Sequence, residues 1–297
     1  MQQDNEKINR LLKLRSRIIS AIREFFDSAD YVEVDTPSLV YNPPVDAYID
    51  LIEAAGHRYL VPSPEIQMKT LLSRGLERIY QIGHAFRDGE AGPWHNPEFT
   101  MLEWYRVGAD YRDIMDETQE LAARVASLTD TPVSVPFRRE SITSVFTRAA
   151  GWDPCSCWNE DRFFSDLVGR IEPAIKSEEA VFLYDYPTPV AAMAEVKTGN
   201  GTICERFELY LGGIEIANGY TELKDPAEQK MRFFTENERR VGMGKPAYPA
   251  DESYISTLQG GLPPCAGAAL GIDRIAAFFL QTDGIRDVMT FPDSSLR

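Results

Sequence analysis

The stretch from Phe86 to Tyr105, FRDGEAGPWHNPEFTMLEWY, carries the side chains best suited to chemistry. It combines cationic, aromatic and carboxylate groups in two expected strands and the loop between them. In the second strand, alternation places four side chains on one face, namely Phe99, Met101, Glu103 and Tyr105. A carboxylate among apolar groups is costly to bury without a cationic partner, so Glu103 needs either solvent or a bound ammonium group. The stretch therefore predicts a site for a nucleotide and an amine.

A second candidate is the expected hairpin ERFELYLGGIEIANGY, residues 205–220. A two-residue turn at Gly212 and Gly213 pairs residue 211 with 214, 210 with 215 and 208 with 217. Glu208 and Glu215 then lie on one face as diagonal neighbours, roughly 7–8 Å apart. Two carboxylates at that spacing can share a magnesium ion that also holds nucleotide phosphates.

Alternatively, Glu208 and Glu215 lie on a strand face that is simply exposed to solvent. Two further polar side chains, Asn218 and Glu222, follow on the same segment, and an independent strand supplies Phe99 and Glu103. This combination favours a binding site over a solvated surface.

Basic side chains flank the same regions. Arg87 ends the first expected strand, and His95 and Asn96 precede the second, so the loop between them could fold over a triphosphate. A guanidinium group offers a planar fork to phosphate or carboxylate oxygens. Arg274 opens an expected helix in GIDR, where it is alternatively an ion-pair partner of Asp273. Together with the glutamates, these side chains predict nucleotide binding.

The composition narrows the class of protein. The chain has 297 residues, of which 43% are hydrophobic and 26% charged, enough for a core in one large domain or two small ones. No apolar run approaches the roughly 20 residues that cross a bilayer, and MQQDNEKINR lacks the order of a signal peptide. We therefore expect a cytoplasmic protein without a membrane partner. The four cysteines match neither a disulfide framework nor a zinc ribbon.

The charge balance disfavours broad binding to a nucleic-acid backbone. The net charge is -15, from 31 basic and 46 acidic residues. Basic residues gather in the first expected helix, where they are best explained as a solvated face.

Hydrophobic periodicity predicts elements that can position the candidate residues. Helices are expected at 8–26, 64–75, 113–128, 161–175 and 224–244, with Pro64 in the first turn of the second. Strands are expected at 31–36, 57–61, 77–87, 98–106, 180–187 and in the hairpin, and 268–280 begins as a strand or turn and closes as a helix. The strands that carry the site dominate, which favours an α+β domain around a mainly antiparallel sheet over a βαβ array. The sequence contains no glycine-rich phosphate loop and no repeat.

The Phe86–Tyr105 stretch resembles motif 2 of class II aminoacyl-tRNA synthetases, and GAALGIDR resembles motif 3. The segment ERFELYLGGIEIANGYTEL is similar to the lysyl subgroup, and the first helix ending in EVDTP resembles motif 1, whose proline lies at the dimer interface. The match covers essentially the whole chain. It implies a single class II catalytic domain over residues 1–297, with a mainly antiparallel sheet flanked by helices, and a homodimer through the motif 1 helix and strand.

The resemblance also implies roles for the candidate residues. ATP and magnesium are the expected cofactors: Arg87 would hold the α-phosphate and the amino-acid carboxylate, Phe99 would stack on adenine, and Arg274 would grip the γ-phosphate. The metal ligands would be Glu208 and Glu215. Other residues expected near the nucleotide are Asp88, Gly89, His95, Asn96, Ile216 and Gly271.

For a lysine-type substrate, Glu65 would take the α-amino group. Glu103, Tyr105 and Glu222 would surround the side-chain ammonium. The remaining substrate-binding residues would be Ser63, Pro64, Asn218 and Ala269. Arg87 and Arg274 are the expected catalytic residues.

Two departures from lysyl-tRNA synthetases change the expected acceptor. Only about nine residues precede the first motif 1 helix, so an N-terminal OB-fold that reads an anticodon would not fit there. In motif 3, Ala269 replaces the middle glycine, and its methyl group would crowd an α-amino acid and favour a β-amino isomer. These features resemble the stand-alone synthetase paralogues that transfer (R)-β-lysine to a lysine of elongation factor P. Lysine or (R)-β-lysine is thus the expected substrate, and tRNA is disfavoured as the acceptor.

A third departure lies in motif 2, where relatives read FRNE and this chain has Arg87-Asp88-Gly89-Glu90. If Glu90 does not reach the adenine amino group, nucleotide affinity is weaker or a backbone carbonyl substitutes.

Three alternatives remain at this point. The first is a truncated lysyl-tRNA synthetase that charges tRNA, and the second is a non-catalytic regulatory paralogue, which the retained Arg87, Glu208, Glu215 and Arg274 disfavour. The third is an asparagine synthetase A type of amide formation on free aspartate, which gives no reason for acidic and phenolic groups around an amine.

Overall fold

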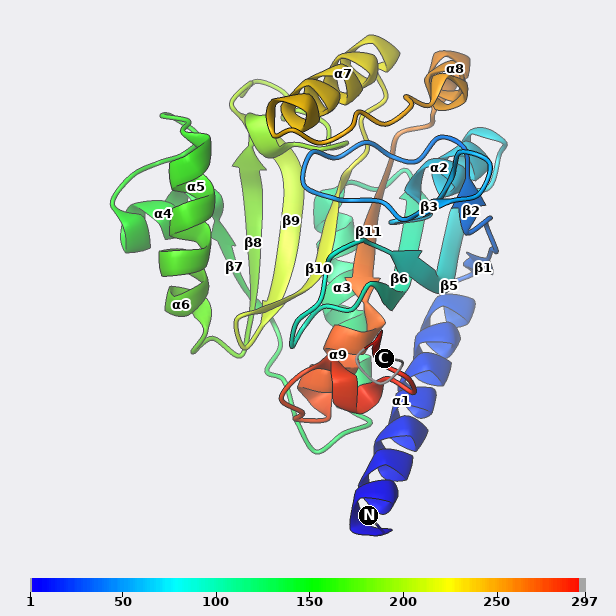
Figure 1. Cartoon of the computed structure of the whole chain (residues 1–297). Helices are drawn as coiled ribbons and strands as arrows, with labels where there is room; N and C mark the ends of the chain where they lie inside the picture. The colour runs from blue at the N-terminus through cyan, green and yellow to red at the C-terminus, as the bar shows by residue number, and fades with distance from the viewer. Residues whose placement is uncertain (1, 294–297) are drawn as a thin grey trace.

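The computed structural model describes residues 2–293, so Met1 and 294–297 lie outside the described part of the chain. Its centre is an eight-stranded sheet with the order β1-β5-β6-β11-β10-β9-β8-β7 (Figure 1). All pairs are antiparallel except the two edge pairs β1 with β5 and β7 with β8. The strands are β1 (Val32–Glu33), β5 (Arg78–Phe86), β6 (Glu98–Val107), β7 (Arg138–Ser141), β8 (Ala180–Pro187), β9 (Ile203–Leu211), β10 (Ile214–Thr221) and β11 (Cys265–Gly271).

A small second sheet has the order β2-β4-β3, built from β2 (Leu39–Val40), β3 (Glu53–Ala54) and β4 (Arg58–Leu60). The α-helices are α1 (Gln2–Ser28), α2 (Glu65–Ser73), α3 (Tyr111–Ala126), α4 (Ile142–Ala150), α5 (Glu160–Asp166), α6 (Glu172–Ile175), α7 (Pro226–Gly242), α8 (Glu252–Gly261) and α9 (Ile272–Phe279). Shorter helical turns are η1 (Leu167–Ile171), η2 (Thr188–Val190) and η3 (Ile285–Val288), of which η1 is a π-helix. None of the described helices is long and apolar enough to cross a membrane.

Local sequence explains where the main helices begin. Asp110 caps α3 by accepting from the backbone N–H groups of Arg112 and Asp113, and Asp113 completes a capping box. Asp225 caps α7 in the same way and is followed by Pro226 at the first helical position. These caps satisfy backbone donors that the helix itself leaves unpaired.

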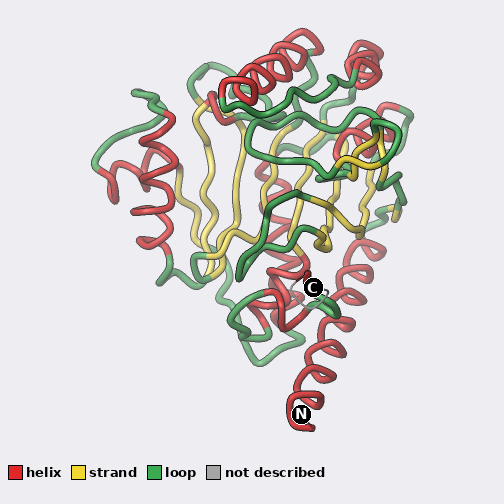
Figure 2. The backbone as a smooth tube through the Cα atoms, in the orientation of Figure 1, coloured by secondary structure: helices red, strands yellow, loops and turns green. Residues whose placement is uncertain are grey.

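The two faces of the sheet carry separate cores. One face packs against α1, α3 and α9, with a cluster that includes Phe26, Leu102, Trp104 and Phe207. The other face carries a second cluster, which includes Tyr105 and side chains from α2, α4, α7 and α8. Figure 2 shows helices on both sides of the strands, with α7 and α8 at the top. Alternation along β6 therefore divides its side chains between the core under α1, α3 and α9 and the face that also holds the cavity described below.

The structure confirms the expected α+β architecture with a mainly antiparallel sheet. The hairpin turn and its first two pairs are also as expected, but the pairing of residue 208 with 217 is wrong. A bulge between Glu215 and Ala217 places Asn218 opposite Glu208. The extra residue shifts the register, which a simple two-residue hairpin does not allow for.

Other local expectations also need correction. The region 161–175 is not one continuous helix, because the π-helical turn η1 separates α5 from α6. Pro64 occupies the N-cap of α2 instead of its first turn. Two short helices, α4 and α8, were not expected from the sequence.

Candidate active site

A cavity of about 520 Å³ opens on the sheet face opposite α1, α3 and α9. Strands β6, β9, β10 and β11 supply one wall, and residues 44–49 and α7 supply another. The lining brings together Arg87, Glu208 and seven of the eight expected substrate-binding residues, namely Ser63, Glu65, Glu103, Tyr105, Asn218, Glu222 and Ala269. Pro64 is absent from the lining and lies at the start of α2.

Glu103 lies at the centre of a buried polar cluster. Its side chain is 2% exposed, and its two oxygens accept hydrogen bonds from Ser63 Oγ at 2.8 Å and Tyr105 Oη at 2.5 Å. Burial and the nearby Glu65 carboxylate raise the pKa of Glu103 to about 7, and the Tyr105 and Ser63 hydroxyls act in the opposite direction. A cation bound beside Glu103 would favour its charged form.

Two further carboxylates share an internal lysine. Lys69 is fully buried, with its Nζ 2.6 Å from Glu65 Oε1 and ion-paired with Glu222 Oε2. Burial opposes the charge on Lys69, but Glu222 and Glu65 hold its pKa well above the ordinary value. Burial raises the pKa of Glu222 to about 8, against the influence of Lys69. Glu222 Oε2 is held by this ion pair, whereas Oε1 is buried without a partner, which leaves that oxygen available to a ligand.

Strand register places Ala269 in the floor of the cavity. Ala269 pairs with Glu103 of β6 on one side and with Asn218 of β10 on the other. Two residues earlier, a Cβ on Gly267 would lie 2.3 Å from the Tyr105 ring, so only glycine fits there. Ala269 thus adds only a methyl group to the cavity floor, between Glu103 and Asn218.

Glu208 is more fully partnered than the sequence indicated. Its Oε2 accepts hydrogen bonds from Tyr186 Oη at 2.6 Å and Tyr210 Oη at 2.7 Å, and its Oε1 accepts from Arg206 at 2.8 Å. Arg206 also donates to Asn218 Oδ1 at 3.1 Å. A carboxylate with these donors can offer one remaining lone pair on Oε1.

Arg274 organises a second group of expected residues. It donates to the carbonyl oxygens of Trp94 at 3.1 Å and Glu215 at 3.0 Å, and its guanidinium lies 2.7 Å from His95 Nε2. Burial and Arg274 lower the pKa of His95. Burial and the neighbouring Glu208 carboxylate raise the pKa of Glu215. Asp273 forms its ion pair with Arg15 instead, at 2.7 Å. The alternative that Arg274 serves only as an ion-pair partner of Asp273 is therefore excluded.

Arg87 lines the cavity and lies over the ring of Phe99. Its guanidinium carbon lies 5.2 Å from the Phe99 ring centroid, and its contact with Glu90 is loose, at 3.8 Å. The Nε of Arg87 is buried without a hydrogen-bond partner. An orphaned donor of this kind fits an anionic ligand, because leaving it unpaired costs free energy.

The other residues expected near the nucleotide either offer backbone groups to a ligand or form hydrogen bonds within the protein. Gly89 has φ +73°, which glycine adopts without strain, and its N–H bonds to Asp88. Asn96 donates to the Glu98 carbonyl and accepts from a backbone N–H. The Ile216 side chain is buried in the core, so only its backbone can face a ligand. Gly271 caps α9, three residues before Arg274.

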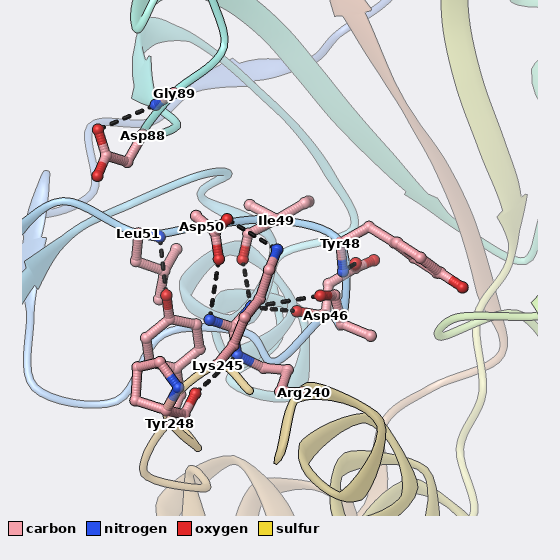
Figure 3. A network of polar contacts seen from close by, with 12 residues as sticks. Asp46, Tyr48, Ile49, Asp50, Leu51, Asp88, Gly89, Arg240, Lys245 and Tyr248 are labelled. Carbon is pink, nitrogen blue, oxygen red and sulfur yellow. Dashed lines mark hydrogen bonds and ion pairs between the residues drawn. The ribbon is translucent and has the colours of Figure 1, made fainter. Parts of the chain in front are cut away.

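A buried arginine fixes the loop that forms one cavity wall. Figure 3 shows Arg240 of α7 pointing into the turn at residues 46–50, where it donates to the carbonyls of Asp46 and Ile49 and to the Asp50 carboxylate at 3.0 Å. Lys245 binds the other oxygen of Asp50 at 2.8 Å. The Asp50 carbonyl accepts in turn from Asp88 N–H, which joins this loop to motif 2.

Sequence reasoning missed several contributors to the site, among them Lys69 and Arg206. Lys69 is spaced i,i+4 from Glu65 on α2, and Arg206 is spaced i,i+2 from Glu208 on β9, so periodicity could have found both. The sequence also indicated no site residue in the region 110–179. Three of its side chains line the cavity, namely Phe163, Phe164 and Leu167.

A family model for class II tRNA synthetases (D, K and N) matches residues 1–295. The chain belongs to this class II synthetase family. Class II relatives similar to it share the name elongation factor P--(R)-beta-lysine ligase. The relative from Hamiltonella defensa subsp. Acyrthosiphon pisum is 36% identical, over 98% of this chain and 97% of its own length. The relative from Proteus mirabilis is also 36% identical with the same coverage, and that from Vibrio cholerae is 39% identical over 95% and 94%.

The synthetase family implies ATP and magnesium, and the residues present fit them to different degrees. The orphaned Nε of Arg87 and the half-buried Phe99 suit a nucleotide. Glu215 offers a partly exposed carboxylate, whereas Glu208 has a single free lone pair. Among residues 2–293, no three His, Cys, Asp or Glu side chains gather as a metal site. A magnesium ion here would therefore take most of its ligands from phosphate oxygens and water.

Proposed function

We propose that this protein uses ATP to activate a lysine-type amino acid, preferably (R)-β-lysine, and transfers it to a lysine side chain of elongation factor P. The observation that carries the proposal is the cavity in which Glu65, Glu103 and Glu222 surround a single internal ammonium group, that of Lys69. Buried carboxylates need cationic partners, and a diamino acid brings two. The acceptor is inferred from the shared name of the relatives.

The first step would be in-line attack of the amino-acid carboxylate on the α-phosphorus of ATP. A carboxylate oxygen–phosphorus bond forms, the bond to the β-phosphate oxygen breaks, and pyrophosphate leaves. Arg87 would neutralise the charge that develops on the α-phosphate, because it lines the cavity and has a free donor. Its guanidinium also lies over the ring of Phe99, the expected adenine contact, which supports this role.

Arg274 and His95 would orient the leaving pyrophosphate. The lowered pKa of His95 keeps its ring neutral, and Nε2 accepts from Arg274. The ring proton then lies on Nδ1, which can donate to a phosphate oxygen. Glu215 would be the main protein ligand of magnesium and Glu208 a secondary one, and the ion would supply further charge neutralisation.

In the second step, the acceptor amine would attack the acyl carbonyl, forming an amide bond and releasing AMP. The carboxylate cluster would hold the amino acid and Arg87 its phosphate, so positioning would supply the rate enhancement without a covalent enzyme nucleophile. The Ala269 methyl between Glu103 and Asn218 would favour an amine displaced by one carbon, which supports the β-isomer as substrate.

We also propose that the described chain acts as one catalytic domain in the cytoplasm and forms a homodimer through α1 and β1. The uninterrupted sheet and the family match over residues 1–295 support the single domain. The net charge of -15 disfavours tRNA as the acceptor.

The test supplies ATP with labelled (R)-β-lysine or L-lysine and then adds either elongation factor P or tRNA. We expect the label on elongation factor P, with more from the β-isomer. Label on tRNA alone would favour the truncated lysyl-tRNA synthetase and overturn the proposal. Label on neither acceptor, without amino-acid-dependent ATP consumption, would favour the non-catalytic paralogue.

A further inference from the structure

We infer that Lys69 is a specificity-determining residue: it is a permanent internal counter-cation of the cluster Glu65, Glu103 and Glu222, and it leaves this cluster with two carboxylates to pair with the two ammonium groups of a diamino acid. The inference rests on the proposed function, because it takes a diamino acid as the ligand of Glu65, Glu103 and Glu222.

Lys69 lies behind the cavity wall. Its side chain is fully buried and does not line the cavity, whereas Glu65 and Glu222, which hold its Nζ, both do. The Nζ also lies 5.2 Å from the Tyr220 ring centroid and 5.9 Å from that of Tyr105. A substrate can therefore contact the outer sides of the carboxylates without displacing the lysine.

The surroundings of Lys69 keep it charged. The groups that face it come from five elements, and the carboxylates of Glu222 and Glu65 act on it most strongly: Glu65 of its own helix, Glu103 and Tyr105 of β6, Tyr220 and Glu222 at the end of β10, Tyr254 of α8 and Cys265 of β11. Their charges outweigh the desolvation of the ammonium group. Lys69 thus contributes one fixed positive charge at every pH at which the protein works.

Three carboxylates with one fixed ammonium group accept two more cations. Glu65 is anchored further by the hydroxyl of Tyr220, so its position is set before a substrate binds. Without Lys69, the third charge would draw a proton onto the cluster, and that proton would compete with the substrate's ammonium groups. Removing the lysine should therefore move the pH range in which a diamino acid binds.

The experiment measures the KM for (R)-β-lysine by amino-acid-dependent exchange of pyrophosphate into ATP, from about pH 6 to pH 9. In the wild type, the KM should fall as Glu103 and Glu222 ionise. In Lys69→Met, the midpoint of this fall should move upward by about one pH unit or more, and the KM at neutral pH should rise at least about tenfold, with a smaller change in kcat. Lys197→Met is the matched control, because Lys197 forms an ion pair with Asp185 at 2.7 Å outside the cavity lining.

A second variant separates charge balance from packing. Lys69→Met combined with Glu222→Gln removes one charge of each sign, so the midpoint should return toward that of the wild type even if the KM stays raised. Thermal unfolding of each variant identifies loss of fold. An unchanged midpoint in Lys69→Met, or a double variant whose midpoint stays displaced, would overturn the inference. If Lys69→Met does not fold, the double variant decides. Absence of exchange with any diamino acid in the wild type would refute the proposed function instead.

Discussion

Replacing Glu103 with glutamine should improve stability and damage substrate binding at the same time. Glu103 is buried, and its pKa of about 7 means that ionisation is unfavourable in the folded protein without a ligand. Glutamine keeps the shape of the side chain and removes the charge. The two effects have opposite signs because the carboxylate serves a cationic ligand and not the fold.

The magnitude follows from the pKa difference. The ordinary value is 4.5, and each unit corresponds to about 1.4 kcal/mol, so ionised Glu103 costs the fold roughly 3 kcal/mol. The pKa of Glu103 is higher in the folded protein than in the unfolded chain. The wild type therefore keeps its full stability below pH 4.5, where Glu103 is protonated, and loses this contribution as pH rises through about 7. Glutamine avoids that loss but gives up about 1 kcal/mol of hydrogen bonding to Tyr105 or Ser63. At pH 8, the variant should therefore gain about 2 kcal/mol.

Substrate binding should respond in the other direction. Losing one partner of a buried ion pair costs roughly 2–5 kcal/mol, so the KM for (R)-β-lysine should rise by about 30-fold or more. Urea unfolding at pH 4 and pH 8 measures stability, and pyrophosphate exchange measures the KM. Glu98→Gln, on the same strand but 57% exposed, should change neither quantity. A Glu103→Gln variant with an unchanged KM, or with no greater gain at pH 8 than at pH 4, would refute the reasoning.

Three further predictions concern the floor, the metal and the cavity wall. Ala269→Gly should raise the use of L-lysine relative to (R)-β-lysine by about tenfold in kcat/KM, and an unchanged ratio would show that Ala269 is not the selector. Glu215→Gln should raise the magnesium concentration for half-maximal exchange by about tenfold, and an unaltered requirement would exclude it as a ligand. Arg240→Met should cost roughly 3–5 kcal/mol in urea unfolding, since it removes a buried donor from several carbonyls and from one Asp50 oxygen, while Lys245 holds the other. Arg239→Met, at a partly exposed position, should cost less than about 1 kcal/mol; equal losses would contradict the role of Arg240.

Much of the fold follows from local sequence. The alternation from residue 98 to 107 correctly places Glu103 and Tyr105 on the cavity face and Leu102 and Trp104 on the opposite face, because strand geometry alone determines which face a residue occupies. The bulge at Glu215 was not predictable in this way, since both the regular and the bulged hairpin preserve the glycine turn. The π-helical turn η1 likewise interrupts a sequence whose helical pattern is continuous.

The site was predictable where a motif carried it and hidden where tertiary contacts made it. Motif resemblance identified residues that meet in the cavity from β6, β10 and β11, although they are far apart in the sequence. The pairing of Lys69 with Glu222 depends on α2 packing beside the end of β10, which no local pattern specifies. The donors around Glu208 come from β8 and β9, so its limited capacity for a metal appeared only in the fold.

The most direct test of the central claim compares two substrates in pyrophosphate exchange with the wild-type protein at pH 8. One is (R)-β-lysine, and the other is the same β-amino acid without its terminal amine. A cluster that leaves two carboxylates to pair with the substrate should use the diamine with a kcat/KM at least about 30-fold higher, as expected for one lost buried ion pair. Equal use of the two substrates would contradict the claim that this cluster recognises a lysine-type amino acid.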